Sequence, residues 1–160
     1  MRVYILRHAT AEIRGVGLPD SQRRLTAEGK KELKAVLQQA SAAGVSPETI
    51  LTSPWVRALE TARMAGKELH CERLVETRSL LPDVAPAQIL REIRALAKAK
   101  EVMVAGHEPQ LSRLAGFLLE APVAVDLKKG ALLRIDIEEK DGPPRGVLKW
   151  MLTPRLAGGK

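Results

Sequence analysis

Two arginines and two histidines are the residues of this sequence best suited to chemistry on an anionic group. His8 follows Arg7 directly after an apolar run, and His107 follows a second apolar run. Arg57 lies four residues after Ser53, which opens a predicted helix. A guanidinium offers a planar fork of donors to phosphate oxygens, and a neutral imidazole can attack phosphorus. These residue types therefore predict a phosphate site if the fold brings them together.

Three predicted strands, at residues 3–6, 49–52 and 101–105, end where these residues begin. In a parallel sheet, ligands bind beyond the carboxyl ends of the strands. Helices that start near Pro54 and Pro109 would add backbone N–H donors and a partial positive charge at the same edge. We therefore expect Arg7, His8, Arg57 and His107 to share one rim of the sheet.

The remaining pattern alternates strands with helices. Helices are predicted from the N-cap Thr26 to Gly44, from Ser53-Pro54 to about residue 69, over 86–99 with Ala97 facing inward, and over 109–119. A short strand is predicted at 73–75, and strands at 131–137 and 147–152 form a hairpin around residues 140–144. This order predicts an α/β fold, a three-layer αβα sandwich whose mostly parallel sheet is closed by a C-terminal hairpin. Residues 1–153 would form one domain and residues 154–160 a flexible tail.

The composition is that of a globular protein. The chain has 160 residues, of which 45% are hydrophobic and 28% charged, and its mean hydropathy is −0.11. The apolar run at 3–6 is too short for a signal peptide or a membrane-spanning helix, so we expect a cytoplasmic protein with no membrane partner. The single Cys71 allows no intrachain disulfide and fits a reducing compartment.

The net charge of +7 raises the question of nucleic-acid binding. The basic residues alternate with Glu, however, and aromatic residues make up only 2% of the chain, too few for a base-stacking platform. We therefore expect the charge to attract anionic substrates and no nucleic-acid partner. A non-catalytic phosphate- or nucleic-acid-binding module remains the alternative from another class.

Four motifs in this order resemble the histidine phosphatase superfamily, whose fold is called phosphoglycerate mutase-like. They are Leu6-Arg7-His8-Ala9, Leu25-Thr26-Ala27-Glu28-Gly29, the segment from Ser53 to Ala62, and Gly106-His107-Glu108-Pro109. The short chain and the final hairpin with Trp150 resemble the SixA-type phosphohistidine phosphatases in particular. The resemblance implies that His8 is the nucleophile, that Arg7, Arg57 and His107 grip the phosphoryl oxygens, and that Arg23 assists weakly.

No metal or cofactor is implied, and His8, His70 and His107 show no close metal-ligand spacing. The sequence departs from the usual Arg-His-Gly at Ala9, where a left-handed backbone would be mildly costly. Larger members take a general acid from a loop that corresponds here to residues 80–84. Asp83 is the candidate for that role, with an N-cap or loop residue before the helix at Pro86 as the equal alternative.

The resemblance implies a metal-independent phosphatase that works through a covalent phosphohistidine. The expected substrate is phosphohistidine on a phosphorylated protein, because the chain lacks room for the insertions that roof the site in sugar-phosphate enzymes. A general small-molecule phosphomonoesterase is the second enzyme hypothesis. We expect a monomer or a weak dimer.

Overall fold

A single six-stranded sheet organises the chain. The computed structural model describes residues 1–96, 98–138 and 142–158. The strands are β1 (Arg2–Arg7), β2 (Thr49–Thr52), β3 (Leu74–Glu76), β4 (Glu101–Gly106), β5 (Leu132–Ile137) and β6 (Gly146–Leu152), in the spatial order β3-β2-β4-β1-β5-β6. The first four are parallel, whereas β5 and β6 are antiparallel to their neighbours. The predicted parallel sheet closed by a hairpin is thus confirmed.

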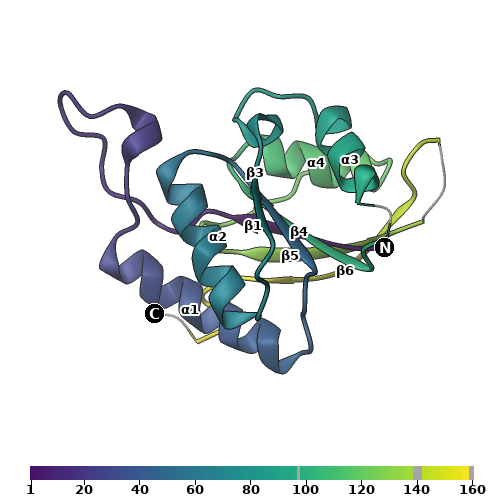
Figure 1. The fold of residues 1–160 in the computed structure, drawn as a ribbon, viewed down its shortest axis with the longest axis horizontal. Helices are drawn as coiled ribbons and strands as arrows, with labels where there is room; N and C mark the ends of the chain where they lie inside the picture. The colour runs from purple at the N-terminus through teal and green to yellow at the C-terminus, as the bar shows by residue number, and fades with distance from the viewer. Residues whose placement is uncertain (97, 139–141, 159–160) are drawn as a thin grey trace.

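Two helices cover each face of the sheet (Figure 1). One face packs against α1 (Ala27–Ala42) and α2 (Val56–Glu68), and the other against α3 (Pro86–Ala95) and α4 (Gln110–Leu118). Side chains of β1 alternate between the two cores: Val3 and Ile5 face α3 and α4, while Tyr4 and Leu6 face α1 and α2. β1 is therefore buried on both faces, as expected for the central part of a three-layer αβα sandwich.

The helix boundaries differ from the predictions in three helices. α2 begins at Val56 with Trp55 as its N-cap, and the buried Ser53 hydroxyl bonds both His107 and the N–H of Trp55. α4 begins at Gln110, one residue after Pro109. α3 ends at Ala95 because the chain turns there to enter β4. The predicted inward position of Ala97 lies outside the described residues.

The segments predicted as loop and tail have local structure. Residues 10–24 contain a short 3-10 helix, η1 (Asp20–Gln22), and Ala11 forms a bridge with Leu25. A second one, η2 (Arg78–Leu80), precedes α3. Residues 154–158 form turns, and Ala157 packs against the core beneath α1 and α2. Flexibility of the tail stays a prediction, and residues 139–141 of the predicted hairpin loop lie outside the described residues. No helix in the described ranges is long and apolar enough to span a membrane.

Candidate active site

The register of the sheet aligns the carboxyl ends of β1, β2 and β4. Arg7 lies opposite Gly106, and Thr52 lies opposite Ala105. The residues that directly follow these strand ends are His8, Ser53 and His107. Backbone hydrogen bonds continue the pairing by one step, since the N–H of His8 donates to Gly106 O at 3.0 Å. The three side chains therefore start from adjacent points on one edge, as the sequence predicted.

His8 is held as a neutral imidazole with one defined lone pair. Its Nδ1 lies 2.7 Å from the carbonyl oxygen of Ala9, so Nδ1 donates and Nε2 keeps its lone pair. Burial lowers the pKa of His8 to about 3, with smaller lowering by Arg57 and Arg7, against a raising effect of the Ala9 bond. At neutral pH the ring is therefore uncharged, the form that a nucleophile needs.

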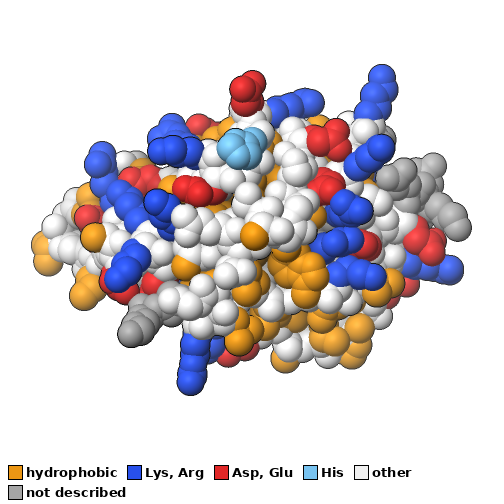
Figure 2. All heavy atoms as spheres, turned by 90° about the horizontal axis from the view of Figure 1, so that it is seen from below, with side chains coloured by type: hydrophobic (Ala, Val, Ile, Leu, Met, Phe, Trp, Pro, Cys, Tyr) orange, Lys and Arg blue, Asp and Glu red, His pale blue; other side chains and the backbone are white. Residues whose placement is uncertain are grey.

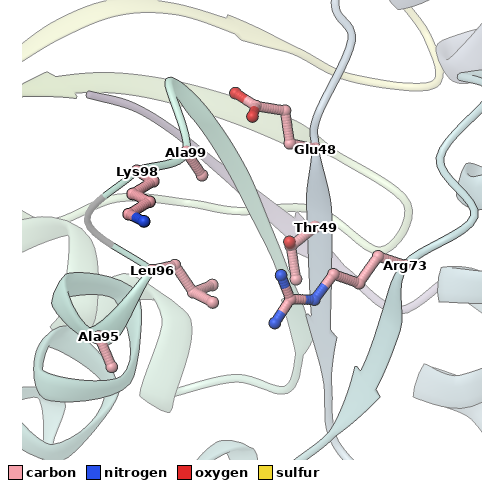
Figure 3. Close-up of a pocket in the computed structure, with 7 residues that line it drawn as sticks. All are labelled: Glu48, Thr49, Arg73, Ala95, Leu96, Lys98 and Ala99. Carbon is pink, nitrogen blue, oxygen red and sulfur yellow. The ribbon is translucent and has the colours of Figure 1, made fainter.

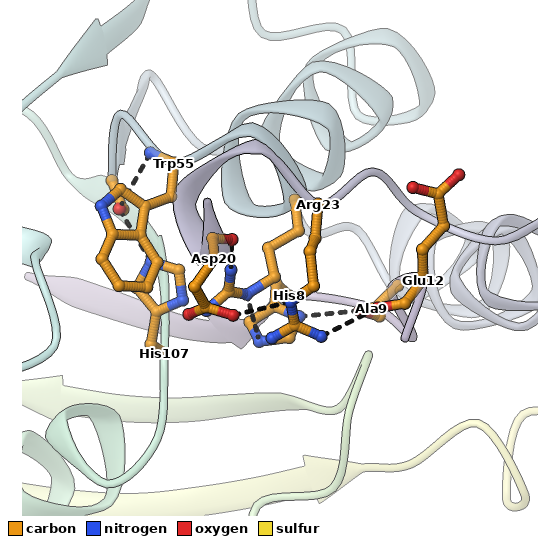
Figure 4. A network of polar contacts seen from close by, with 9 residues as sticks. His8, Ala9, Glu12, Asp20, Arg23, Trp55 and His107 are labelled. Atoms are coloured by element: carbon orange, nitrogen blue, oxygen red, sulfur yellow. Dashed lines mark hydrogen bonds and ion pairs between the residues drawn. The ribbon is translucent and has the colours of Figure 1, made fainter. Parts of the chain in front are cut away.

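Arg57 faces the nucleophilic nitrogen. Its Nε donates to Nε2 of His8 at 3.2 Å, and its two terminal nitrogens donate to the carbonyl oxygen and carboxylate of Asp20 at 2.8 and 3.2 Å (Figure 4). The guanidinium also lies 4.7 Å from the centroid of the Trp55 ring. Burial lowers the pKa of Arg57, and the Asp20 charge opposes that change. Arg57 stays a fixed cation beside His8.

Asp20 links Arg57 to Arg23. Its other carboxylate oxygen accepts from Arg23 Nε at 2.7 Å, and Arg23 also donates to the carbonyl oxygen of Glu12 at 2.9 Å. Burial by itself raises the pKa of Asp20, but bonds and charges of Arg23 and Arg57 hold it below its usual range. Arg23 lines the pocket, and it also acts through the carboxylate that orients Arg57.

His107 lies between His8 and the Trp55 ring. The centroid separations are 5.3 Å to His8 and 4.9 Å to Trp55. Its Nε2 lies 2.8 Å from the hydroxyl of Ser53. Burial lowers the pKa of His107 to about 3, and the nearby charge of Arg57 lowers it further. His107 is therefore also neutral at physiological pH, and only one of its nitrogens carries a proton.

Two buried nitrogens at this edge lack a hydrogen-bond partner within the described residues: Nδ1 of His107 and Nε of Arg7. Arg7 is otherwise fixed, since its NH1 donates to Leu127 O at 2.8 Å. Buried polar atoms normally have partners, so each such atom needs an explanation. Both residues line one pocket of about 330 Å³. Arg7 and His107 therefore bring unpaired donors to the wall of a pocket that could hold an anion.

The same pocket brings together most of the predicted site and adds residues that the motifs did not assign. His8, Arg7, Arg57, His107 and Arg23 line it, together with Ala11, Asp20, Trp55, Pro82, Glu108 and Lys129. Trp55 and Ser53 belong to a quoted motif, so their positions could have suggested a role. Asp20 and Lys129 lie in loops. Their distance from the motifs along the chain does not indicate that they line the pocket.

Asp83 is not brought to the pocket. It is exposed and absent from the lining, and the N-cap of α3 is Ala85, which makes no side-chain cap. Glu108 does line the pocket, and Asp20, the other carboxylate in the lining, is bonded to Arg23 and Arg57. Glu108 also accepts from the backbone N–H and the hydroxyl of Ser112 in the first turn of α4. An acid for the leaving group is therefore better sought at Glu108.

Ala9 is accommodated without strain. Its φ is outside the left-handed region, its side chain is buried in the core, and its N–H donates to the hydroxyl of Thr61 at 3.1 Å. The cost expected for a left-handed alanine does not arise. Among the described side chains, no group of three or more His, Cys, Asp or Glu could hold a metal ion.

The surrounding surface mixes both signs of charge. On the face in Figure 2, Lys and Arg side chains lie among Asp and Glu side chains. Such mixing agrees with the alternation of charges along the sequence. No broad patch of basic side chains is visible in this view.

The site gathers arginines and neutral imidazoles at the carboxyl edge of an αβα sheet, and comparison with known proteins gives the family. The profile of the histidine phosphatase superfamily (branch 1) matches residues 3–81. An uncharacterised protein of Picosynechococcus sp. is 35% identical over 119 residues, covering 72% of this chain and 71% of its own. The chain belongs to the histidine phosphatase superfamily.

One curated relative and two solved structures carry more specific names. Phosphohistidine phosphatase SixA of Escherichia coli is 25% identical over 160 residues, covering 96% of this chain and 94% of its own. A solved structure of the protein histidine phosphatase SixA complexed with tungstate superposes with a TM-score of 0.86 at 25% identity, covering 97% of this chain and 98% of that chain. The putative SixA from Agrobacterium tumefaciens shares the fold, with a TM-score of 0.82, 23% identity and coverage of 96% and 97%. These similarities support a phosphatase.

Proposed function

We propose that this chain removes the phosphoryl group from phosphohistidine on proteins, with His8 as the covalent acceptor. The observation that carries the proposal is the neutral His8 ring, whose Nδ1 is bonded to Ala9 and whose Nε2 faces the pocket beside Arg57. The similarity to SixA, whose printed name specifies phosphohistidine, supports this substrate.

In the first step, the phosphoryl oxygens accept from Arg7, Arg57 and His107. The N–H of Arg57 that donates to His8 turns to an oxygen, and this frees the lone pair of Nε2. Nε2 attacks phosphorus in line, and the bond from phosphorus to the leaving group breaks with its electron pair on the leaving group. Water or Glu108 supplies the proton that the leaving group takes. Charge on the three equatorial oxygens is spread over the two guanidiniums and His107.

In the second step, water attacks the phosphorus of phospho-His8. The P–N bond breaks, its electron pair returns to Nε2, and the water proton passes to bulk solvent or to a carboxylate. Inorganic phosphate then leaves. The Ala9 carbonyl keeps the Nδ1 proton in place throughout, so Nε2 is ready for the next cycle.

A turnover panel tests the proposal. Purified protein is compared on a phosphohistidine peptide, p-nitrophenyl phosphate and sugar phosphates, with His8→Ala as the inactive control. The proposal predicts the highest kcat/KM on the phosphohistidine peptide. A higher value on a small phosphomonoester would favour the general phosphomonoesterase instead, and phosphate binding without turnover of any substrate would favour a binding module.

A further inference from the structure

A basic groove adjoins the active-site pocket. It has a volume of about 950 Å³ and is lined by Arg7, Glu32, Lys128, Lys129, Pro154 and Arg155, together with two threonines and a glycine. Arg7 and Lys129 line both hollows. The groove therefore lies next to the place where the phosphoryl group would bind.

The groove is built by segments that pack against one another. The turn carrying Lys128 and Lys129 ends at Gly130, whose N–H donates to the carbonyl oxygens of Arg7 and His8 at 3.2 and 3.1 Å. Gly130 has a φ of +73°, which favours glycine, and a Cβ there would lie 3.4 Å from Pro154. The lysine turn is thereby fixed to the strand end that carries the nucleophile and to the segment after β6.

The charges of the groove are unbalanced. Lys128, Lys129 and Arg155 contribute three exposed cations, whereas Glu32 contributes one carboxylate. Lys128 pairs with Asp126 at 2.7 Å, but both side chains are mostly exposed, so the pair stabilises little. Lys129 and Arg155 make no ion pair within the described residues. The net positive field favours an anionic occupant.

We propose that this basic groove holds an acidic segment that flanks the phosphorylated side chain of a protein substrate. The proposal deepens, and rests on, the proposed phosphohistidine phosphatase function. A phosphoryl group and its imidazole occupy only the 330 Å³ pocket, whereas a peptide would extend into the adjoining groove. Complementary charges would speed the encounter and lower KM more than they raise kcat. The six lining residues named above include no aromatic side chain on which a nucleic-acid base could stack.

The test uses two phosphohistidine peptides, one flanked by Asp and Glu and the other by Asn and Gln at the same positions. For the unmodified protein we expect kcat/KM on the acidic peptide to be about tenfold higher, with the difference mainly in KM. The double variant Lys128→Glu, Arg155→Glu should lose this preference. Its turnover of p-nitrophenyl phosphate, which does not reach into the groove, should change by less than about twofold.

A matched control replaces the same number of basic residues at a different site. Arg73 and Lys98 line a separate hollow of about 460 Å³ at the amino ends of β2 and β4 (Figure 3). The variant Arg73→Glu, Lys98→Glu has the same net charge as the groove variant and should keep the preference. If the control variant also lost the preference for the acidic peptide, the preference would depend on net charge and not on the groove, and the proposal would be overturned.

The remaining outcomes separate the groove from the activity. Equal kcat/KM on the two peptides would overturn the groove proposal alone. Turnover of p-nitrophenyl phosphate without turnover of either peptide would overturn the proposed function and the groove proposal with it. Inhibition by single-stranded RNA that exceeds inhibition by an acidic peptide, and that disappears in the groove variant, would identify a nucleic acid as the occupant instead.

Discussion

Replacing Ser53 with alanine should disable His107 without removing any group that touches the substrate. The hydroxyl of Ser53 accepts from the N–H of Trp55 at 3.3 Å and lies 2.8 Å from Nε2 of His107. Donation of its single proton to Nε2 satisfies both contacts and leaves the proton of the neutral ring on Nδ1. Nδ1 is the buried atom without a partner within the described residues. Ser53 thus selects the tautomer that can donate to a phosphoryl oxygen.

The magnitude follows from the lost hydrogen bond. Leaving a buried polar group without its partner costs about 1–3 kcal/mol, which corresponds to a loss of roughly 5- to 150-fold in kcat. Complete loss of the His107 donor would reduce kcat about 100- to 1,000-fold. The kcat of the alanine variant should therefore lie between that of a protein without this donor and that of the unmodified protein. The variant Ser53→Ala should therefore reduce kcat on p-nitrophenyl phosphate with little change in KM.

The assay pairs kinetics with a direct reading of the tautomer. The matched control is Thr52→Val, which removes a neighbouring buried hydroxyl that bonds the Ser53 carbonyl oxygen at 3.1 Å and not His107. Nitrogen-15 NMR of the His107 ring should show the proton on Nδ1 in the unmodified protein and in Thr52→Val, and a shift toward Nε2 in Ser53→Ala. An unchanged kcat with Nδ1 still protonated in Ser53→Ala would refute the reasoning.

Three further predictions follow from the same geometry. Arg57→Lys should lower kcat about 100- to 1,000-fold, because a single ammonium nitrogen cannot span the three acceptors that the planar guanidinium reaches. An unchanged rate in steady-state kinetics would show that these bonds do not contribute to catalysis. Glu108→Gln should slow alkyl phosphates more than p-nitrophenyl phosphate, whose leaving group needs no acid, whereas Asp83→Asn should leave both rates unchanged; the reverse pattern in a substrate series would return the acid role to Asp83. The folded-state pKa values of His8 and His107, about 3, lie below the ordinary 6.5 of an unfolded chain, so the unfolded state binds more protons between these limits. The free energy of unfolding should therefore fall as pH drops from 6.5 toward 3, by about 2 kcal/mol for each ring by pH 5. Urea unfolding in phosphate-free buffer should show a weaker pH dependence when both are replaced by Asn, and an equal dependence would contradict the burial argument.

The sequence could predict Arg7, His8 and His107 because each lies at the end of an apolar run. Once such runs form parallel neighbours, the register alone brings the residues that follow them to one edge. Arg57 could be predicted because a helix starts just before it. These residues can be predicted from the local sequence pattern and from the rule that parallel strands end at the same edge of a sheet.

Asp20 could not be predicted in this way. It orients Arg57 only because the chain after β1 returns through the bridge between Ala11 and Leu25, and no local pattern encodes that path. The position of Ser53 shows a related limit. Its residue type predicts an N-cap, but its hydroxyl bonds both His107 and the N–H of Trp55, and α2 starts at Val56 instead. Tertiary contacts override local propensity at both positions.

Asp83 was expected in the site from the family pattern of a loop acid. Gln110 fixes the packing of that loop, since its side chain donates to Ser79 O and Val84 O at 3.0 and 2.9 Å, and in this packing Pro82 lines the pocket while Asp83 is exposed. Glu108 instead reaches the lining because it follows His107 directly. The choice between two carboxylates thus depends on loop packing that the sequence pattern does not contain.

The central claim is that His8 carries the phosphoryl group. The most direct measurement is the intact mass of the protein after rapid alkaline quenching during turnover, followed by peptide mapping of the adduct. We predict one acid-labile phosphoryl group on His8, absent from His8→Ala, which should also lack turnover. An adduct on His107, or turnover that survives in His8→Ala, would contradict the account.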